Sequence, residues 1–222
     1  MDYFHTRNGL DDKILKGTTT IALVCSQGAV VGADTRVISG YLIAHKKGRK
    51  IFTITPRITV TMAGVVADAQ ALIDSLKYNV KLYELRNKTM MNPKSAARLL
   101  SFILFRNRMF PLITELLVAG VDGDGGFSIY RLDPFGSLTQ DDFSVTGSGS
   151  PIAIGVLENE YKKEATVEEA IDLVAKALHA AMKRDLGSGD DFDIVVVGRD
   201  GVKELGKEEK DNLIKRVSSI ST

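Results

Sequence analysis

Residues 17–34 read GTTTIALVCSQGAVVGAD, and this stretch determines how the chain begins to fold. Thr18–Cys25 and Ala29–Asp34 are rich in apolar and β-branched residues, which is typical of strands. Gln27-Gly28 lies between them and predicts a tight turn. We therefore expect a β-hairpin at the start of the fold.

The register of this hairpin follows from its turn. With a two-residue loop, Ser26 faces Ala29 and Asp34 lies opposite Ile21, which brings Asp34 close to Thr18. Acidic residues are depleted in strands, so Asp34 should have a partner there. A second interpretation is an aspartate that caps the turn at the strand end.

The remaining elements follow from hydrophobic periodicity. Tyr41–His45 and Lys50–Thr55 are expected to form a second hairpin. The other expected strands are Ile58–Ala63, Glu115–Val121, Phe127–Leu132, Phe143–Thr146, Ile194–Gly198 and Val202–Leu205; the expected helices are 67–86, 92–106, 151–157, 166–185 and 208–217.

Helices thus come in pairs between blocks of antiparallel strands. Two stacked sheets with a helical layer outside each would bury every apolar face. The sequence predicts an α+β fold in one domain, a four-layer α-β-β-α sandwich of two antiparallel sheets.

Composition narrows the function classes. The chain has 222 residues and a formal charge of +1, with both signs interspersed, so no nucleic-acid or membrane surface is indicated. No segment approaches the roughly 18 consecutive apolar residues of a membrane span. The single cysteine, Cys25, is compatible with a reducing cytoplasm. The histidines His5, His45 and His179 lack metal-ligand spacing, so a metal site is not expected.

Thr18 could be a nucleophile. A threonine hydroxyl needs an adjacent base, and an N-terminal threonine has its own α-amine for that purpose. Residues 1–17 are charged and lack an apolar signal region, so they are interpreted as a leader that ends where Gly17–Thr18 is cut. The alternative is that the three threonines only begin a strand.

Lys50 and Gly64 also have two interpretations each. Lys50 could pair with a buried carboxylate and exchange a proton with a neighbouring hydroxyl, or it could be a solvated turn lysine. Gly64 ends a strand before a helix, where its N–H could stabilise an oxyanion, or it could be an ordinary turn glycine.

Six motifs in one order make the chain resemble the β-type subunits of the 20S proteasome, archaeal-like, within the N-terminal-nucleophile hydrolases. The resemblance covers nearly everything after residue 17. The motifs are Gly17-Thr18-Thr19-Thr20, Gly32-Ala33-Asp34-Thr35-Arg36, His45–Ile51, Ala63–Gln70, Thr146–Pro151, and Arg184-Asp185 with Ser188-Gly189-Asp190.

The resemblance implies a threonine peptidase that uses no cofactor. Thr18 is the implied nucleophile, with Asp34 and Lys50 as partners and Gly64 as the oxyanion donor. The residues implied to hold Thr18 and its amine are Ser148, Asp185 and Ser188.

A specificity pocket is implied as well, and it would be apolar, favouring cleavage after hydrophobic residues. Its expected residues are Val37, Met62, Val66 and Gln70. Ile38 stands where relatives often have threonine or serine, but because that position acts through its main chain, we expect little effect.

Partners follow from the resemblance alone. It implies stacked seven-membered rings of α subunits and β subunits in the cytoplasm, fed indirectly by a regulatory ATPase with unfolded polypeptides. The alternatives are a non-catalytic ring subunit of the same fold, a bacterial two-ring peptidase and another self-processing amidohydrolase. An α-type subunit would begin with a helical extension instead.

Overall fold

The computed structural model describes residues 17–219, and of the predicted leader only Gly17 falls within it. The first sheet has the order β10-β1-β2-β11-β12 and the second has the order β5-β6-β7-β8-β9. The strands of the first sheet are Phe143–Gly147, Thr19–Cys25, Gly28–Asp34, Phe192–Gly198 and Gly201–Glu204, and those of the second are Ile51–Thr55, Ile58–Gly64, Thr114–Val121, Phe127–Leu132 and Leu138–Asp141. Every pairing within them is antiparallel.

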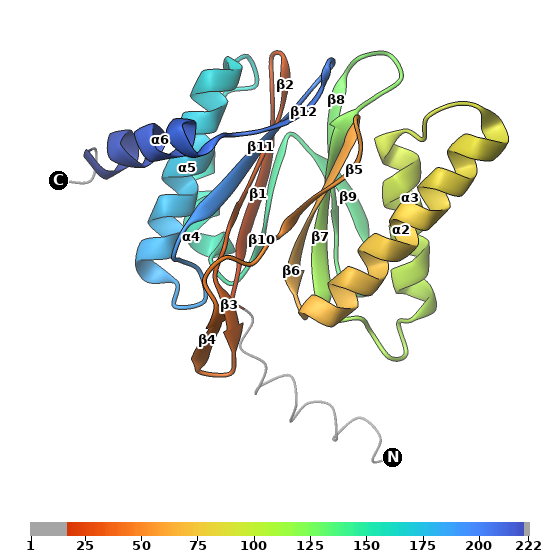
Figure 1. Cartoon of the computed structure of the whole chain (residues 1–222), viewed down its shortest axis with the longest axis horizontal. Coiled ribbons are helices and arrows are strands. Elements are labelled where there is room, and N and C mark those ends of the chain that lie inside the picture. Colours follow the sequence, from red (N-terminus) through yellow and green to blue (C-terminus); the bar gives the residue numbers. More distant parts are fainter. Residues whose placement is uncertain (1–16, 220–222) are drawn as a thin grey trace.

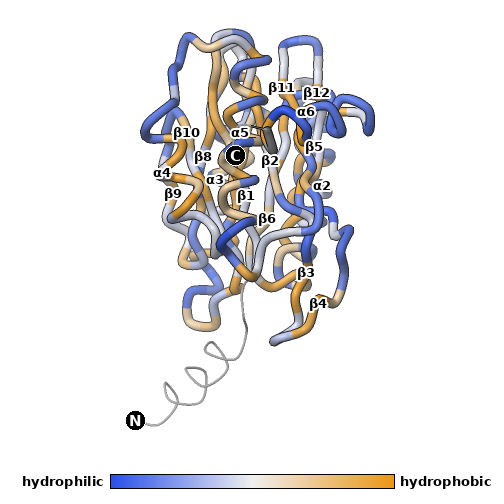
Figure 2. Tube along the Cα trace, turned by 90° about the vertical axis from the view of Figure 1, so that its left-hand side faces the viewer, coloured by the Kyte–Doolittle hydropathy of each residue, from blue (hydrophilic) through white to orange (hydrophobic). Residues whose placement is uncertain are grey.

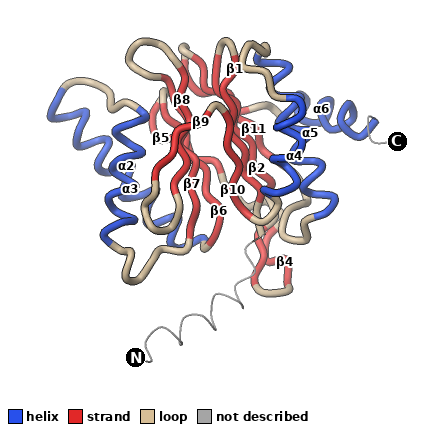
Figure 3. The backbone as a smooth tube through the Cα atoms, turned by 180° about the vertical axis from the view of Figure 1, so that it is seen from behind, coloured by secondary structure: helices blue, strands red, loops and turns tan. Residues whose placement is uncertain are grey.

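The two sheets lie face to face, with helices on both outer sides (Figure 1). Helices α4 (Ser150–Glu160), α5 (Val167–Arg184) and α6 (Lys207–Ser219) cover the first sheet, while α2 (Val66–Asn87) and α3 (Pro93–Arg106) cover the second. The view from behind shows the same four layers (Figure 3). The predicted four-layer α-β-β-α sandwich is confirmed.

Alternation along the strands explains why this arrangement forms. On β1, Ile21 and Leu23 pack under the helices, whereas Ala22 and Val24 face the opposite sheet. A strand buried on both faces needs a continuous apolar run, and β1 is buried at every position. Figure 2 shows hydrophobic residues along the strands and hydrophilic residues in many connecting loops.

The first hairpin forms with a register different from the predicted one. Its loop is Ser26-Gln27, because Cys25 pairs with Gly28. Asp34 therefore ends β2 beside Thr19, two residues nearer the strand start than the predicted partner Ile21. A Cβ on Gly28 would lie 3.1 Å from the carbonyl oxygen of Val197, so this glycine serves close strand packing rather than the turn.

The predicted second hairpin is wrong. Leu42–His45 (β4) pairs with the short strand Val37–Ser39 (β3), which had no strand signal, and β5 pairs with β6. The β3–β4 hairpin projects from the sandwich, with Tyr41 97% exposed and Leu42 74% exposed at its tip (Figure 1). Because β4 and β5 belong to different sheets, residues 46–50 connect the hairpin to the second sheet.

Other predicted elements are present with shifted ends. The expected short helical piece at 151–157 is the eleven-residue helix α4, and β9 was missed. No helix within residues 17–219 has the length and apolar character needed to cross a bilayer.

The first residues of α5 make the hydrogen bonds typical of a capped helix start. Thr166 Oγ1 accepts the Glu169 N–H at 3.2 Å, and Glu169 Oε2 accepts the Thr166 N–H at 2.7 Å, so the two residues form a capping box. Substituting Thr166→Ala should lower the free energy of unfolding by about 1 kcal/mol, because one helix-end N–H loses its acceptor. Thermal denaturation measures this loss, with Thr166→Ser as the control that keeps the hydroxyl. An unchanged melting temperature for Thr166→Ala would contradict the role of the cap.

Candidate active site

Asp34 lies at the centre of a buried polar cluster where the two sheets meet. Its side chain has no exposed surface, and its Oδ1 accepts hydrogen bonds from the Thr19 N–H and from Lys50 Nζ, each at 2.8 Å. Its Oδ2 accepts the backbone N–H groups of Arg36 at 3.0 Å and of Gly189 at 3.1 Å. All four donors stabilise the carboxylate, so Asp34 is far more than a turn cap.

Lys50 reaches Asp34 from the other sheet. It directly precedes β5, is 3% exposed, and its carbonyl accepts the Met62 N–H at 3.0 Å. Burial lowers the pKa of the Lys50 ammonium, and the Asp34 carboxylate opposes that shift. Burial likewise raises the pKa of Asp34, against the effect of Lys50 and the N–H donors. The solvated-turn interpretation of Lys50 is therefore wrong.

Thr18 directly precedes β1 and is 5% exposed. Its hydroxyl donates to the carbonyl oxygen of Gly17, the residue on the other side of the predicted cleavage bond. Its backbone N–H donates to Ser148 Oγ at 3.2 Å. The Thr18 hydroxyl thus contacts the carbonyl that it would attack. The Thr18 nitrogen, which cleavage would free, contacts Ser148.

Asp185 anchors the serines next to Thr18. Its Oδ2 accepts the hydroxyls of Ser148 and Ser188, each at 2.6 Å. Because Ser148 donates to Asp185, its lone pairs remain available to the Thr18 nitrogen. The Ser188 hydroxyl also lies 2.7 Å from Thr19 Oγ1. Asp185 ends α5 and Ser148 precedes α4, so two helix ends meet at Thr18.

Glycines permit the close approach of backbone around Thr18. A Cβ on Gly147, which has a φ of +93°, would lie 2.2 Å from the Thr18 carbonyl oxygen. A Cβ on Gly17 would lie 2.6 Å from both Gly187 and the Ile38 side chain. Larger residues at these two positions would displace Thr18.

Two hollows open on either side of Thr18 and share Gly64. The first, of about 370 Å³, is lined by Val37, Met62 and Val66 of the predicted specificity pocket, together with Lys50. The second, of about 190 Å³, is lined by residues that include Ser148 and Glu115. Gly64 has a φ of +127°, and a Cβ there would lie 2.3 Å from the Ile113 carbonyl oxygen, so this position at the end of β6 requires glycine.

The structure brings together all the predicted catalytic residues and three of the four predicted pocket residues. Gln70 is exposed on α2 and does not line the first hollow. Arg36 and Gly189 were missed as individual residues, although both stand in motifs that pointed to the family. Arg36 Nε contacts Asp190 Oδ2 at 2.9 Å, which ties the loop after β2 to the loop that carries Ser188.

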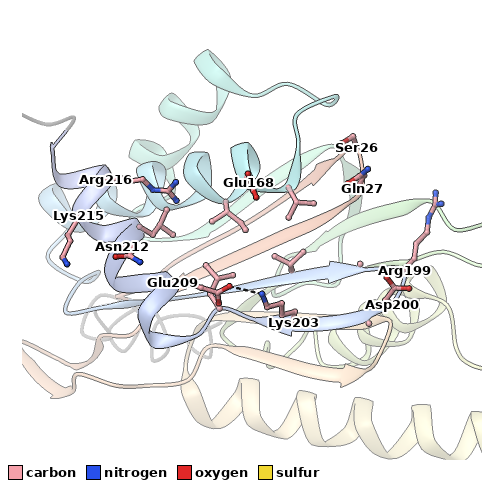
Figure 4. Close-up of a pocket in the computed structure, with 17 residues that line it drawn as sticks. Ser26, Gln27, Glu168, Arg199, Asp200, Lys203, Glu209, Asn212, Lys215 and Arg216 are labelled. Atoms are coloured by element: carbon pink, nitrogen blue, oxygen red, sulfur yellow. Dashed lines mark hydrogen bonds and ion pairs between the residues drawn. The ribbon is translucent and has the colours of Figure 1, made fainter.

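A larger hollow lies elsewhere, between α5, α6 and the β11–β12 hairpin (Figure 4). Its volume is about 1180 Å³, and none of the predicted site residues lines it. Lys203 and Glu209 at its edge pair with each other at 2.9 Å. Among the residues that the structure describes, no cluster of three or more histidine, cysteine or acidic side chains could hold a metal ion.

Comparisons with known proteins identify the family of this chain. A family model described as "Proteasome subunit" matches residues 14–197. The chain is 44% identical over 197 residues to "Proteasome subunit beta 2" of Aeropyrum pernix, covering 88% of this chain and 89% of that protein. It is 44% identical over 206 residues to "Proteasome subunit beta" of Archaeoglobus profundus, covering 92% and 95%. A third relative, "Proteasome subunit beta" of Methanocaldococcus vulcanius, is 41% identical over 201 residues, or 90% of each chain.

The family match, the three relatives and the two-sheet sandwich all lead to one assignment: this chain belongs to the proteasome subunit family, among its β-type members.

Proposed function

We propose that this chain is a catalytic threonine endopeptidase of the proteasome core, and that it activates itself by cutting Gly17–Thr18. The observation that carries the proposal is the contact of the Thr18 hydroxyl with the Gly17 carbonyl, beside the buried Asp34–Lys50 pair. A ring subunit without activity has no need of a buried ion pair next to Thr18. Burying such a pair costs desolvation energy, and a proton-transfer role gives a functional reason for that cost.

Self-cleavage would begin from the contact already present. Thr18 Oγ attacks the Gly17 carbonyl carbon through a five-membered ring, and the bond from that carbon to the Thr18 nitrogen breaks. The nitrogen takes up the proton, which leaves Gly17 attached to Thr18 as an ester. Water hydrolyses the ester and releases residues 1–17, so the mature catalytic domain is residues 18–222. The freed amine remains beside Ser148 Oγ.

Peptide cleavage would repeat the attack on an external carbonyl. Thr18 Oγ forms an acyl-enzyme with the substrate, the amine fragment leaves with a proton, and water then clears the ester. Gly64 donates its N–H to the developing oxyanion. Two groups can move the proton, namely the freed α-amine, whose ordinary pKa is about 7.7–8.0, and Lys50, whose pKa burial lowers.

The first hollow would hold the substrate residue before the cut. Val37, Met62 and Val66 give it an apolar lining, so we propose a preference for cleavage after hydrophobic residues. Gln70 is no longer part of this proposal, because it does not line the hollow.

Assembly with other subunits fits the exposed apolar surface of the isolated chain. Phe102 and Phe105 on α3 are 57% and 51% exposed, and Tyr41 and Leu42 project from the β3–β4 hairpin. Such surface on a single chain indicates contact with partners. We propose stacked seven-membered rings with α subunits and other β subunits in the cytoplasm, which receive unfolded polypeptides with the help of a regulatory ATPase.

Removing the Thr18 hydroxyl tests whether the chain is an enzyme. Assembled particles that carry Thr18→Ala should retain residues 1–17 and lose peptide cleavage completely, because no nucleophile remains. Hydrolysis of a short fluorogenic peptide with a hydrophobic residue before the cut measures activity. Thr19→Ala is the control, since its hydroxyl contacts Ser188 and not the scissile bond. Cleavage by Thr18→Ala particles, or none by the wild type, would favour the non-catalytic ring subunit.

Replacing Lys50 tests the proton-transfer role of the ion pair. Lys50→Arg keeps the positive charge beside Asp34 but cannot release a proton near neutral pH, so kcat should fall at least about 100-fold. The control is Lys203→Arg, in which an exposed lysine paired with Glu209 is changed in the same way. Unaltered activity in Lys50→Arg would contradict a proton-transfer role for Lys50.

A further inference from the structure

Three buried hydroxyls meet between the two sheets, close to the candidate active site. Thr20 Oγ1 lies 3.0 Å from Thr61 Oγ1 and 2.7 Å from Thr146 Oγ1, and all three side chains are fully buried. Thr20 and Thr146 are paired on neighbouring strands β1 and β10, whereas Thr61 belongs to β6 of the opposite sheet. Because every hydroxyl has a partner, the cluster avoids the cost of unsatisfied polar groups.

The Thr20–Thr61 contact is one of two buried side-chain links that join the sheets within residues 17–219. The other is the Asp34–Lys50 pair. Most remaining contacts between the inner faces are apolar, and apolar contacts are not directional. The two polar links therefore define how the first sheet is positioned against the second at this end of the sandwich.

Thr20 and Thr61 each lie on backbone close to a proposed catalytic group. Thr20 is the second residue of β1, and Thr18 directly precedes that strand. Thr61 pairs with Ile51, the residue that follows Lys50, and lies three residues before Gly64 on β6. A shift of Thr61 relative to Thr20 would thus move Lys50 and Gly64 relative to Thr18.

We propose that the hydroxyl cluster Thr20–Thr61–Thr146 positions the Thr18 nucleophile of one sheet against Lys50 and Gly64 of the other. Thr20 and Thr61 are positioning residues, since neither reaches the substrate. This inference rests on the proposed peptidase function and extends it to residues outside the site itself. Small displacements of reacting groups cost large factors in rate, so the loss of one hydrogen bond should appear in kcat.

A pair of substitutions at Thr61 separates the hydroxyl from its packing. Thr61→Val keeps the shape and removes the hydroxyl, and kcat of assembled particles should fall about tenfold. KM should stay within about twofold of the wild type, because the apolar lining of the first hollow is unchanged. Thr61→Ser keeps the hydroxyl and loses the methyl group, and it should restore most of kcat.

Thr59 supplies a matched control. It lies two residues earlier on β6, is fully buried, and its hydroxyl has no hydrogen-bond partner. Thr59→Val therefore removes a buried hydroxyl of the same strand face without breaking a link, and kcat should not change. Thr20→Val provides a second break of the cross-sheet contact and should reproduce the effect of Thr61→Val.

The outcomes distinguish this inference from the function on which it rests. Equal kcat for Thr61→Val and wild type, or a Thr61→Ser variant as slow as Thr61→Val, would overturn the positioning role. Failure of Thr61→Val to assemble while Thr61→Ser assembles would assign the hydroxyl to folding and would overturn it as well. Inactive wild-type particles would instead overturn the proposed function.

Discussion

The buried carboxylate of Asp34 is the interaction on which the site depends. It accepts two backbone N–H groups from the loops that follow β2 and α5, one from β1, and the ammonium of Lys50 from the second sheet. Removing one member of such a pair leaves an uncompensated buried charge, which typically costs about 3–5 kcal/mol. Four chain segments would lose their shared acceptor together.

The position of Thr18, directly before β1, is a second constraint on the site. Strand β1 lies inside the first sheet, between β10 and β2, and Thr18 directly precedes it, so the nucleophile is attached to rigid backbone. The helix ends that carry Ser148 and Asp185 then hold its nitrogen. Catalytic groups held on rigid elements keep their geometry through the two successive reactions that we propose.

Sequence reasoning predicted the fold and most of the residues that the structure brings together around Thr18, and its errors have physical causes. Gly28 was assigned to the turn because glycine is common there, but it lies in β2 where the Val197 carbonyl leaves little room. The resulting two-residue error in register placed Asp34 opposite Ile21 instead of beside Thr19. Strand β3 has only three residues and little burial, so no periodicity could reveal it.

The environments of Lys50 and Gln70 could not be predicted from the local sequence. The cluster of basic residues at 46–50 looks like a solvated turn, and only the tertiary packing buries Lys50 against Asp34. Gln70 entered through family resemblance, but the helical turn places it on the exposed side of α2. The hydroxyl cluster around Thr20 was not predicted, because three strands from distant parts of the chain contribute to it.

The mass of this chain, measured on assembled and active particles, tests the central claim most directly. Self-cleavage predicts a mature chain that begins at Thr18 and has lost residues 1–17. An intact chain from Met1 in particles that cleave peptides would contradict the account, because Thr18 would then have no free α-amine.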